Sequence, residues 1–463
     1  IIYASCKIYI SVNGEAEEWL GTEWPTMLGW GWYDSNDNYY PVFHLNQGRN
    51  TISIRKAEPE FPTYVDSVLI TDDLDSGYRP PNNTPGIASD SWQFVASAGL
   101  GDPKNHEVKL ASYNGSLYAS TSNSSLHPAI YKSDDGLGFT KVFDYGRMYR
   151  TLDLRYLDLS NDKSGLYALT DTGNGIAYIT KVDDEQSVSV PIGYYYRYDN
   201  STYVYFNPRG YWTNNIMNFK GYAYAGFYNN GSLYFTMHRT QDPASYPVKK
   251  PENTPVTYEN PLVFPATSKS TIPKPIFEFP WSPVSEPAFG KVPGTNTYYG
   301  NTSVVAQAVF KGKLYVATCN YGYLGRTTQG AQIWRTSDGT SWEKVVGDGF
   351  GNTSLSISKM AVFGGYLYVA GGSSFDENCL YRTKDGTTWE TIDISTVQGM
   401  YAGDMLPYMG KLYLITYNNP CAYSSPDGVT WEAVSDIKFN DPNNGLFTDM
   451  EVYNGSIYVS TRN

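Results

Sequence analysis

The chain has 463 residues, enough for a large core and more than one domain, and a formal net charge of −12. This acidic excess argues against nucleic acid or an anionic membrane surface as a partner. Charged residues make up only 17% of the chain, tyrosine and glycine contribute 43 each, and no apolar run is long enough for a membrane-spanning helix. The composition favours an all-β protein that is extracellular or at the cell surface.

Residues 1–78 contain strand-like segments that do not follow the repeat found later in the chain. Residues 7–14 run into an Asn-Gly turn, residues 30–33 are rich in tryptophan, and β-forming residues recur at 40–55 and 65–72. This order resembles the C-terminal half of a galactose-binding-like carbohydrate-binding-module β-sandwich. The resemblance implies sugar contact through aromatic side chains that can stack on pyranose faces, with Trp24, Trp30, Trp32 and Tyr33 as candidates. Core packing is the alternative role for Trp30 and Trp32.

Half a sandwich would leave a sheet edge unpaired, which natural proteins avoid. We therefore expect the remaining strands to lie on a segment outside this sequence or to be donated by another molecule. An aspartate-rich turn closes the segment and could hold calcium through carboxylate oxygens, at Asp72, Asp73 and Asp75, although a solvated linker is the simpler interpretation. No other cofactor is expected. Residues 79–91, rich in proline and asparagine, are interpreted as a linker.

Residues 92–463 carry a repeated pair of hairpins. Each repeat begins with an aromatic residue, a glycine turn and an apolar β-former run, as in residues 310–317. A second turn follows, with the pattern Asp-Gly-x-Thr/Ser-Trp. It occurs at 334–342, 381–389 and 423–431, about 45 residues apart, with a weaker copy at 133–139. Two hairpins per period predict four-stranded antiparallel sheets, which must pack in a ring to cover both of their faces.

The Asp-Gly turn resembles the Asp-box of sialidase-like β-propellers. From the residue types, the aspartate should accept backbone N–H bonds, the glycine should take a left-handed conformation, and the tryptophan should pack against the neighbouring sheet. The resemblance places these turns on the outer rim, so their roles are structural. The residues concerned are Asp134, Asp338, Asp385 and Asp427, with Trp342, Trp389 and Trp431.

Hairpin counting predicts a propeller of about seven blades, with six or eight as alternatives. The last hairpin has no Asp-Gly turn after it, so residues 92–96 could supply its outer strand. Residues 241–293 hold 12 of the 27 prolines and are interpreted as an insertion in the third blade. This insertion either covers a blade edge or contacts a neighbouring subunit.

Asn-x-Ser/Thr sequons occur in turns and loops. Asn114, Asn230 and Asn454 lie in hairpin turns, where Asn-Gly is favoured for backbone reasons. The glycosylation candidates are therefore the remaining sequons, Asn82, Asn123, Asn200, Asn301 and Asn352.

No catalytic residue is predicted. Arg147, Arg150 and Arg155 cluster with Asp153, but a sialidase needs arginines from several blades, and ordinary ion pairs are the preferred interpretation. We expect a secreted or cell-surface, non-catalytic protein that binds glycans or forms a structural subunit of a surface layer, sheath or filament. Its partners would be glycans or copies of itself. The alternative is a sialidase-like glycoside hydrolase or another glycan-processing enzyme with an appended carbohydrate-binding module.

Overall fold

The computed structural model describes three strands within residues 1–87 and most of residues 92–463. The longer gaps in the description are 172–176, 183–186, 198–203, 208–214, 230–233, 250–273, 291–300, 320–329 and 374–376. The chain forms two compact units, Ile1–Ile87 and Ala88–Asn463.

The first unit contains a three-stranded antiparallel sheet. Its strands are β1 (Ile8–Val12), β2 (Glu18–Leu20) and β3 (Ile52–Lys56), in the order β2-β1-β3. The predicted sugar-stacking residues Trp24, Trp30, Trp32 and Tyr33, the calcium candidates Asp72, Asp73 and Asp75, and the sequon at Asn82 all lie outside the described residues. The resemblance to a carbohydrate-binding module therefore stays a prediction.

The described residues of the second unit form six four-stranded antiparallel sheets, which we call blades one to six in chain order. Blade one consists of β4 (Asn105–Tyr113), β5 (Ser116–Asn123), β6 (Ala129–Ser133) and β7 (Thr140–Asp144). Blade two consists of β8 (Arg150–Leu157), β9 (Gly165–Asp171), β10 (Ala177–Lys181) and β11 (Val188–Pro191). Blade three consists of β14 (Met217–Phe219), β15 (Tyr222–Asn229), β16 (Tyr234–Thr240) and β20 (Ser282–Pro283). Blade four consists of β21 (Ser303–Phe310), β22 (Lys313–Cys319), β23 (Ile333–Thr336) and β24 (Glu343–Val346). Blade five consists of β25 (Leu355–Phe363), β26 (Tyr366–Ser373), β27 (Glu377–Thr383) and β28 (Trp389–Ile392). Blade six consists of β29 (Met400–Tyr408), β30 (Lys411–Asn418), β31 (Ala422–Ser425) and β32 (Glu432–Ala433).

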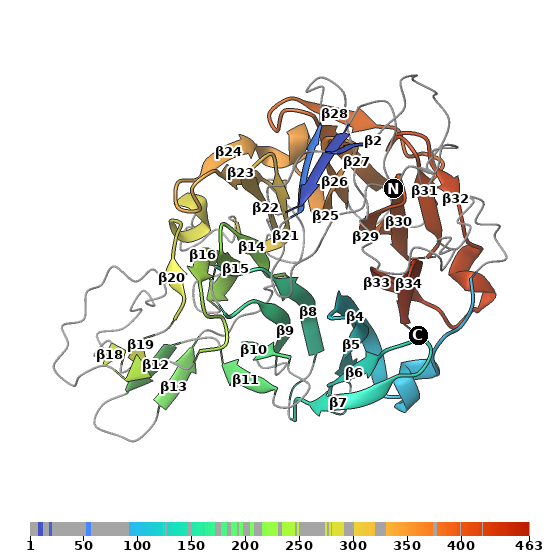
Figure 1. Ribbon diagram of the computed structural model, residues 1–463. Coiled ribbons are helices and arrows are strands. Elements are labelled where there is room, and N and C mark those ends of the chain that lie inside the picture. Colours follow the sequence, from blue (N-terminus) through green and yellow to red (C-terminus); the bar gives the residue numbers. More distant parts are fainter. Residues whose placement is uncertain are drawn as a thin grey trace. The chain divides into compact units, whose positions relative to one another are not determined.

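The innermost strands of successive blades lie side by side around a common axis (Figure 1). A two-stranded sheet, β33 (Leu446–Tyr453) with β34 (Ser456–Arg462), fills the place between blade six and blade one, because β33 contacts both β29 and β4. The described residues thus form an all-β propeller with six four-stranded blades, one fewer than the seven that hairpin counting predicts. The hairpin pattern alone does not reveal that β33–β34 has no further strand among the described residues.

Trp92 fixes the start of this unit to its end. Residues 92–95 form no strand, but the Trp92 indole Nε1 donates a hydrogen bond to the Val434 carbonyl over 2.6 Å. Its ring lies 4.9 Å from that of Phe439 and packs on a core cluster that includes Phe447 of β33. Trp342 of blade four makes the equivalent contacts, donating to the Val284 carbonyl over 2.8 Å and packing 5.1 Å from a phenylalanine ring. Trp92 therefore packs against blade six in the same way as Trp342 of blade four packs against blade three.

The proline-rich segment leaves blade three between β16 and β20. Its described parts form two small sheets. One pairs β18 (Lys274–Pro275) with the hairpin of β12 (Tyr194–Arg197) and β13 (Val204–Asn207), and the other pairs β17 (Val248–Lys249) with β19 (Phe277–Glu278).

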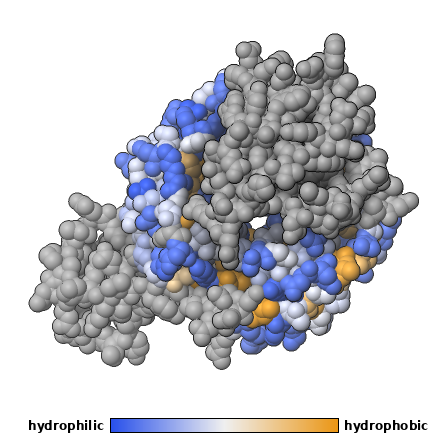
Figure 2. Space-filling model, viewed as in Figure 1, coloured by the Kyte–Doolittle hydropathy of each residue, from blue (hydrophilic) through white to orange (hydrophobic). Residues whose placement is uncertain are grey.

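The core lies between the blades. The second strand of a blade is its most buried element, as β5 and β9 show, and carries a tyrosine that is almost fully buried in blades two to five: Tyr167, Tyr224, Tyr315 and Tyr368. On the face in Figure 2 the described surface is mainly hydrophilic, and the hydrophobic residues on it lie apart from one another.

Candidate functional site

The Asp-Gly turns are rigid structural elements. The Asp338 Oδ1 accepts hydrogen bonds from the backbone N–H groups of Thr340 and Ser341, each over 2.7 Å. Asp385 and Asp427 make the same pair of bonds in their own turns. These backbone hydrogen bonds hold the pKa of Asp338 well below its usual value, because they favour the ionised carboxylate.

In blade one the structure assigns this role to Asp135 and not to the predicted Asp134. Asp135 Oδ1 accepts from the backbone N–H groups of Leu137 (2.8 Å) and Gly138 (2.9 Å). Asp134 instead accepts a bond from the Ser116 hydroxyl. The reason is positional, since the carboxylate must directly precede the glycine of the turn, which here is Gly136.

Each Asp-Gly turn also packs against the tyrosine of the sheet before it. A Cβ at Gly386 would lie 1.9 Å from the Tyr315 hydroxyl, and the same closeness recurs at Gly339, Gly428 and Gly136. The Arg335 Nη1 donates to both the Tyr315 hydroxyl (3.3 Å) and the Gly386 carbonyl (3.2 Å). The tyrosine, arginine and glycine together join one blade to the next at the rim.

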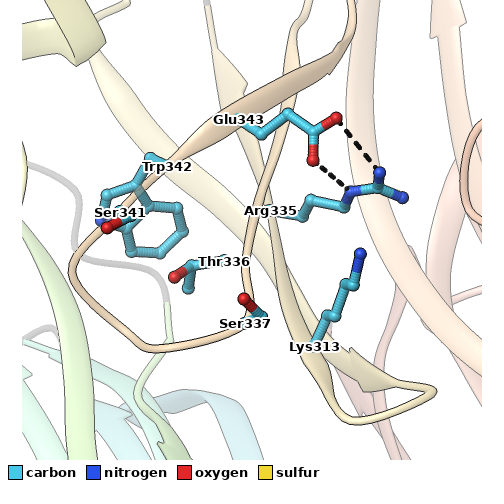
Figure 3. Close-up of a pocket in the computed structure, with 7 residues that line it drawn as sticks. All are labelled: Lys313, Arg335, Thr336, Ser337, Ser341, Trp342 and Glu343. Carbon is cyan, nitrogen blue, oxygen red and sulfur yellow. Dashed lines mark hydrogen bonds and ion pairs between the residues drawn. The ribbon is translucent and has the colours of Figure 1, made fainter.

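A cavity of about 220 Å³ lies beside the Asp338 turn (Figure 3). Its lining residues are Lys313, Arg335, Thr336, Ser337, Ser341, Trp342 and Glu343. The Arg335 guanidinium, however, is held by both oxygens of Glu343, at 2.9 and 3.1 Å, as well as by the contacts to the next blade. The polar groups of this cavity therefore serve the joint between blades four and five, and we do not assign a ligand to it.

The second cluster of charged side chains lies at the propeller axis. It is built from one position that recurs in every sheet, four residues before the last residue of the innermost strand. In blade three this position lies two residues before β14 begins. In ring order this position holds Lys109, Asp153, Asn215, Ala306, Lys359, Asp404 and Asp449. Irregularities in strand pairing lie directly before five of them: Asp153, Ala306, Lys359, Asp404 and Asp449. Such bulges re-aim side chains.

All three aspartates at this position hydrogen-bond to the backbone of the next sheet. Asp153 accepts from the Ile216 N–H (2.8 Å), Asp404 from the Met450 N–H (3.1 Å) and Asp449 from the Leu110 N–H (2.7 Å). The innermost strand is the edge of its sheet, so half of its N–H groups face the axis without a partner strand. A carboxylate from the preceding sheet satisfies one of these groups at three places in the ring.

Cations offset the charge of these carboxylates. The Lys359 Nζ lies 3.2 Å from Asp404, and the Arg155 Nε lies 3.5 Å from Asp153. Burial alone would lower the pKa of Lys109, but the nearby carboxylates of Asp449 and Glu107 outweigh it and raise that pKa. Lys109 therefore remains charged at neutral pH.

Two carboxyl groups in the cluster hold their protons more strongly than usual. Burial raises the pKa of Asp449 to about 6, although Lys109 opposes the shift. Burial, together with the charges of Asp449 and Asp404, raises the pKa of Glu451 to about 7. The carboxyl groups of Asp449 and Glu451 therefore lose their protons closer to neutral pH than ordinary carboxyl groups do.

The sequence predicts only part of this cluster. Asp153 and Arg155 are in it, whereas Arg150 is paired with Asp171 over 2.7 Å and Arg147 lies outside the described residues. The other members, Lys109, Lys359, Asp404, Asp449 and Glu451, were not predicted. The usable signal is a charged residue at a fixed offset before the glycine turn in five of the seven sheets. Within the part of the chain that the structure describes, no group of three His, Cys, Asp or Glu residues could hold a metal ion.

Two of the predicted glycosylation sites are buried. Asn123 and Asn301 are both 0% exposed. The Nδ2 of Asn123 donates to Asn105 (2.8 Å), and that of Asn301 donates to Gln332 (2.9 Å). The fold therefore leaves no room for a glycan at either site. Asn352 is partly exposed and its Oδ1 accepts the Ser354 N–H, while Asn200 lies outside the described residues.

One family model matches part of the chain and agrees with a propeller. Residues 293–454 match the family model described as the DUF6242 beta propeller domain. No curated protein matches the sequence. Similar solved structures include virginiamycin B lyase from Staphylococcus aureus, at 8% identity and a TM-score of 0.47, covering 78% of this chain and 94% of that one.

Puromycin hydrolase is similar at 9% identity and a TM-score of 0.46, covering 79% of this chain and 51% of that one. A PL25 ulvan lyase is similar at 11% identity and a TM-score of 0.43, covering 78% and 93%. At such identities and TM-scores these structures carry no inference about the activity of this chain. Among the described residues there is no helix long and apolar enough to cross a membrane.

Proposed function

We propose that this protein is a non-catalytic extracellular or cell-surface component that binds glycans, forms part of an assembly, or does both. The observation that carries this proposal is the use of the axial aspartates. In most glycoside hydrolases, two carboxyl groups must face the substrate. Here Asp153, Asp404 and Asp449 each accept a main-chain hydrogen bond from the neighbouring sheet, so they are committed to holding the ring together.

The proposal also covers the type of propeller, a seventh blade and the role of the first unit. The hydrogen-bonded turns at Asp338, Asp385 and Asp427 support an Asp-box propeller of the sialidase-like type. The position of Trp92 supports a seventh blade whose outer part comes from the N-terminal side of the propeller. The first unit would be the carbohydrate-binding module, with its missing strands donated by a neighbour, and the proline-rich segment would offer a second contact surface.

A glycan-processing enzyme is the second candidate, and one observation favours it. Glu451 has a pKa of about 7 and lies near Asp449, which is the kind of unequal carboxyl pair that general acid–base catalysis uses. If this pair were catalytic, Glu451→Gln would abolish turnover without unfolding the protein.

The full-length protein tests the proposal in two measurements. We expect binding to at least one polysaccharide or glycan surface, or a native mass that is a multiple of the chain mass, together with no release of reducing sugar or unsaturated product from a panel of polysaccharides. Turnover that Glu451→Gln abolishes would contradict the proposal and establish the second candidate. A monomer that neither binds nor cleaves any member of the panel would contradict both.

A further inference from the structure

The carboxylate-to-amide bond between neighbouring sheets occurs at three of the seven boundaries between the described sheets, and the other four lack the carboxylate. The ring position at these four holds Lys109, Asn215, Ala306 and Lys359. Asn215 partly compensates, because its Oδ1 accepts a hydrogen bond from the Gln307 side-chain amide of the next sheet over 2.8 Å. A methyl group and an ammonium group cannot accept a hydrogen bond. Ala306 and the two lysines therefore offer no acceptor to the edge of the next sheet.

Two of the edge amides left without a carboxylate are consecutive around the axis. Met360 of β25 follows the position held by Ala306, and Met405 of β29 follows the position held by Lys359. Both lie three places from the pair that closes their hairpin, as Met450 does, so their N–H groups face away from the second strand of the sheet. Within the described part of the chain, no acceptor meets either N–H group.

Lys359 supplies a positive charge between these two amides. The innermost strands of blades four and five, β21 and β25, carry one charged residue between them, and it is Lys359. Its side chain is 30% exposed, and its ammonium lies 3.2 Å from one oxygen of Asp404. An opening is visible in Figure 2 where the innermost strands converge in Figure 1. We call Ala306, Lys359 and the N–H groups of Met360 and Met405 the axial gap.

We propose that the axial gap binds the carboxylate of an acidic glycan, with a uronate sugar as the unit that it recognises. The three filled boundaries carry this proposal, since a carboxylate of the protein itself bonds to the same edge N–H there. At the gap a ligand carboxylate would accept the Met360 N–H and be attracted by Lys359. The Met405 N–H is left for a hydroxyl oxygen of the same sugar.

The net charge of −12 does not prevent this binding. Salt screens charges that lie beyond about 8 Å, so the groups at the gap decide whether a carboxylate is attracted. The inference rests on the glycan-binding function proposed above and narrows it to anionic sugars.

Selective nitrogen-isotope labelling of methionine in the full-length protein tests the proposal by NMR, because Met360, Met405 and Met450 hold the same edge position in three successive sheets. Galacturonate is titrated at constant pH and ionic strength, with galactose as the control that lacks only the carboxylate. The amide proton of Met360 should move downfield with galacturonate. That of Met450, already bonded to Asp404, should stay in place, and galactose should move neither signal.

Two variants change the gap itself. Ala306→Asp supplies the missing carboxylate, so the affinity for galacturonate should fall about tenfold or more because the protein's own group competes for the Met360 N–H. Lys359→Gln removes the positive charge and should also weaken binding about tenfold. Lys141→Gln is the matched control. It removes an equal charge from the exposed outer strand β7 and should leave the affinity unchanged.

Full affinity in both gap variants, or no response of Met360 to galacturonate, would overturn the proposal. Galactose binding as tightly as galacturonate would overturn it too, while leaving a glycan-binding function intact. Acetate binding as tightly as galacturonate would overturn the assignment of the gap to a sugar.

Discussion

Gly386→Ala should lower the free energy of unfolding by roughly 3 to 4 kcal/mol. Gly386 has a φ of 80°, a conformation that costs an alanine about 1–2 kcal/mol. The added methyl group would also lie 1.9 Å from the Tyr315 hydroxyl, which is held by Arg335 and cannot retreat without breaking that contact. The overlap adds about 1–3 kcal/mol. Urea denaturation followed by tryptophan fluorescence measures the loss.

Gly365→Ala separates the two causes. Gly365 lies in the first hairpin turn of blade five with a nearly equal φ of 78°, but a Cβ there would meet no atom within 4 Å. This variant should show the conformational cost alone, about 1–2 kcal/mol. Equal losses in the two variants would mean that the tyrosine contact at the rim contributes nothing to the joint between blades.

Trp92→Ala should be the most damaging single change outside the blades, with a loss of about 3 kcal/mol. The indole packs on the cluster of Phe439 and Phe447 and bonds to the Val434 carbonyl, so its removal leaves both a cavity and an unsatisfied acceptor. Because Trp92 joins the start of the propeller to its last sheets, we expect the damage to concentrate at β33 and β34. Limited proteolysis at low protease concentration would locate it, with early cleavage in this sheet.

Trp92→Phe is the control for this change. It keeps an aromatic ring in this cluster but loses the indole N–H and part of the apolar contact, so the cost should be smaller than in Trp92→Ala, at about 1–2 kcal/mol. Wild-type stability in Trp92→Ala would show that the ring closes without this residue.

The propeller could be predicted from the sequence because its rules are local. Gly386 must follow Asp385 for the turn to form, and Trp389 must follow at a fixed distance to pack, so the turns are visible as a repeated motif. The number of four-stranded blades depends instead on pairing. The hairpin at residues 453–458 has the same pattern as the others, although its sheet has only two strands among the residues that the structure describes.

The axial cluster was harder to predict for a different reason. Residues such as Lys359 and Asp404 resemble the exposed charges that alternate with apolar residues on any surface strand. What sets them apart is that the two strands lie at the axis in neighbouring blades and bring the two side chains within 3.2 Å. This contact joins two blades, and no single hairpin in the sequence contains both residues.

The central claim of this account is that the axial aspartates satisfy the free edge amides of neighbouring sheets. Residue-resolved amide exchange at Ile216 and Met450, at constant pH, tests it in Asp153→Ala and Asp404→Ala, each variant serving as the control for the other. We predict that Ile216 alone loses protection in the first variant and Met450 alone in the second. Fast exchange of both amides in the unmodified protein, or unchanged protection after the aspartates are removed, would contradict the claim.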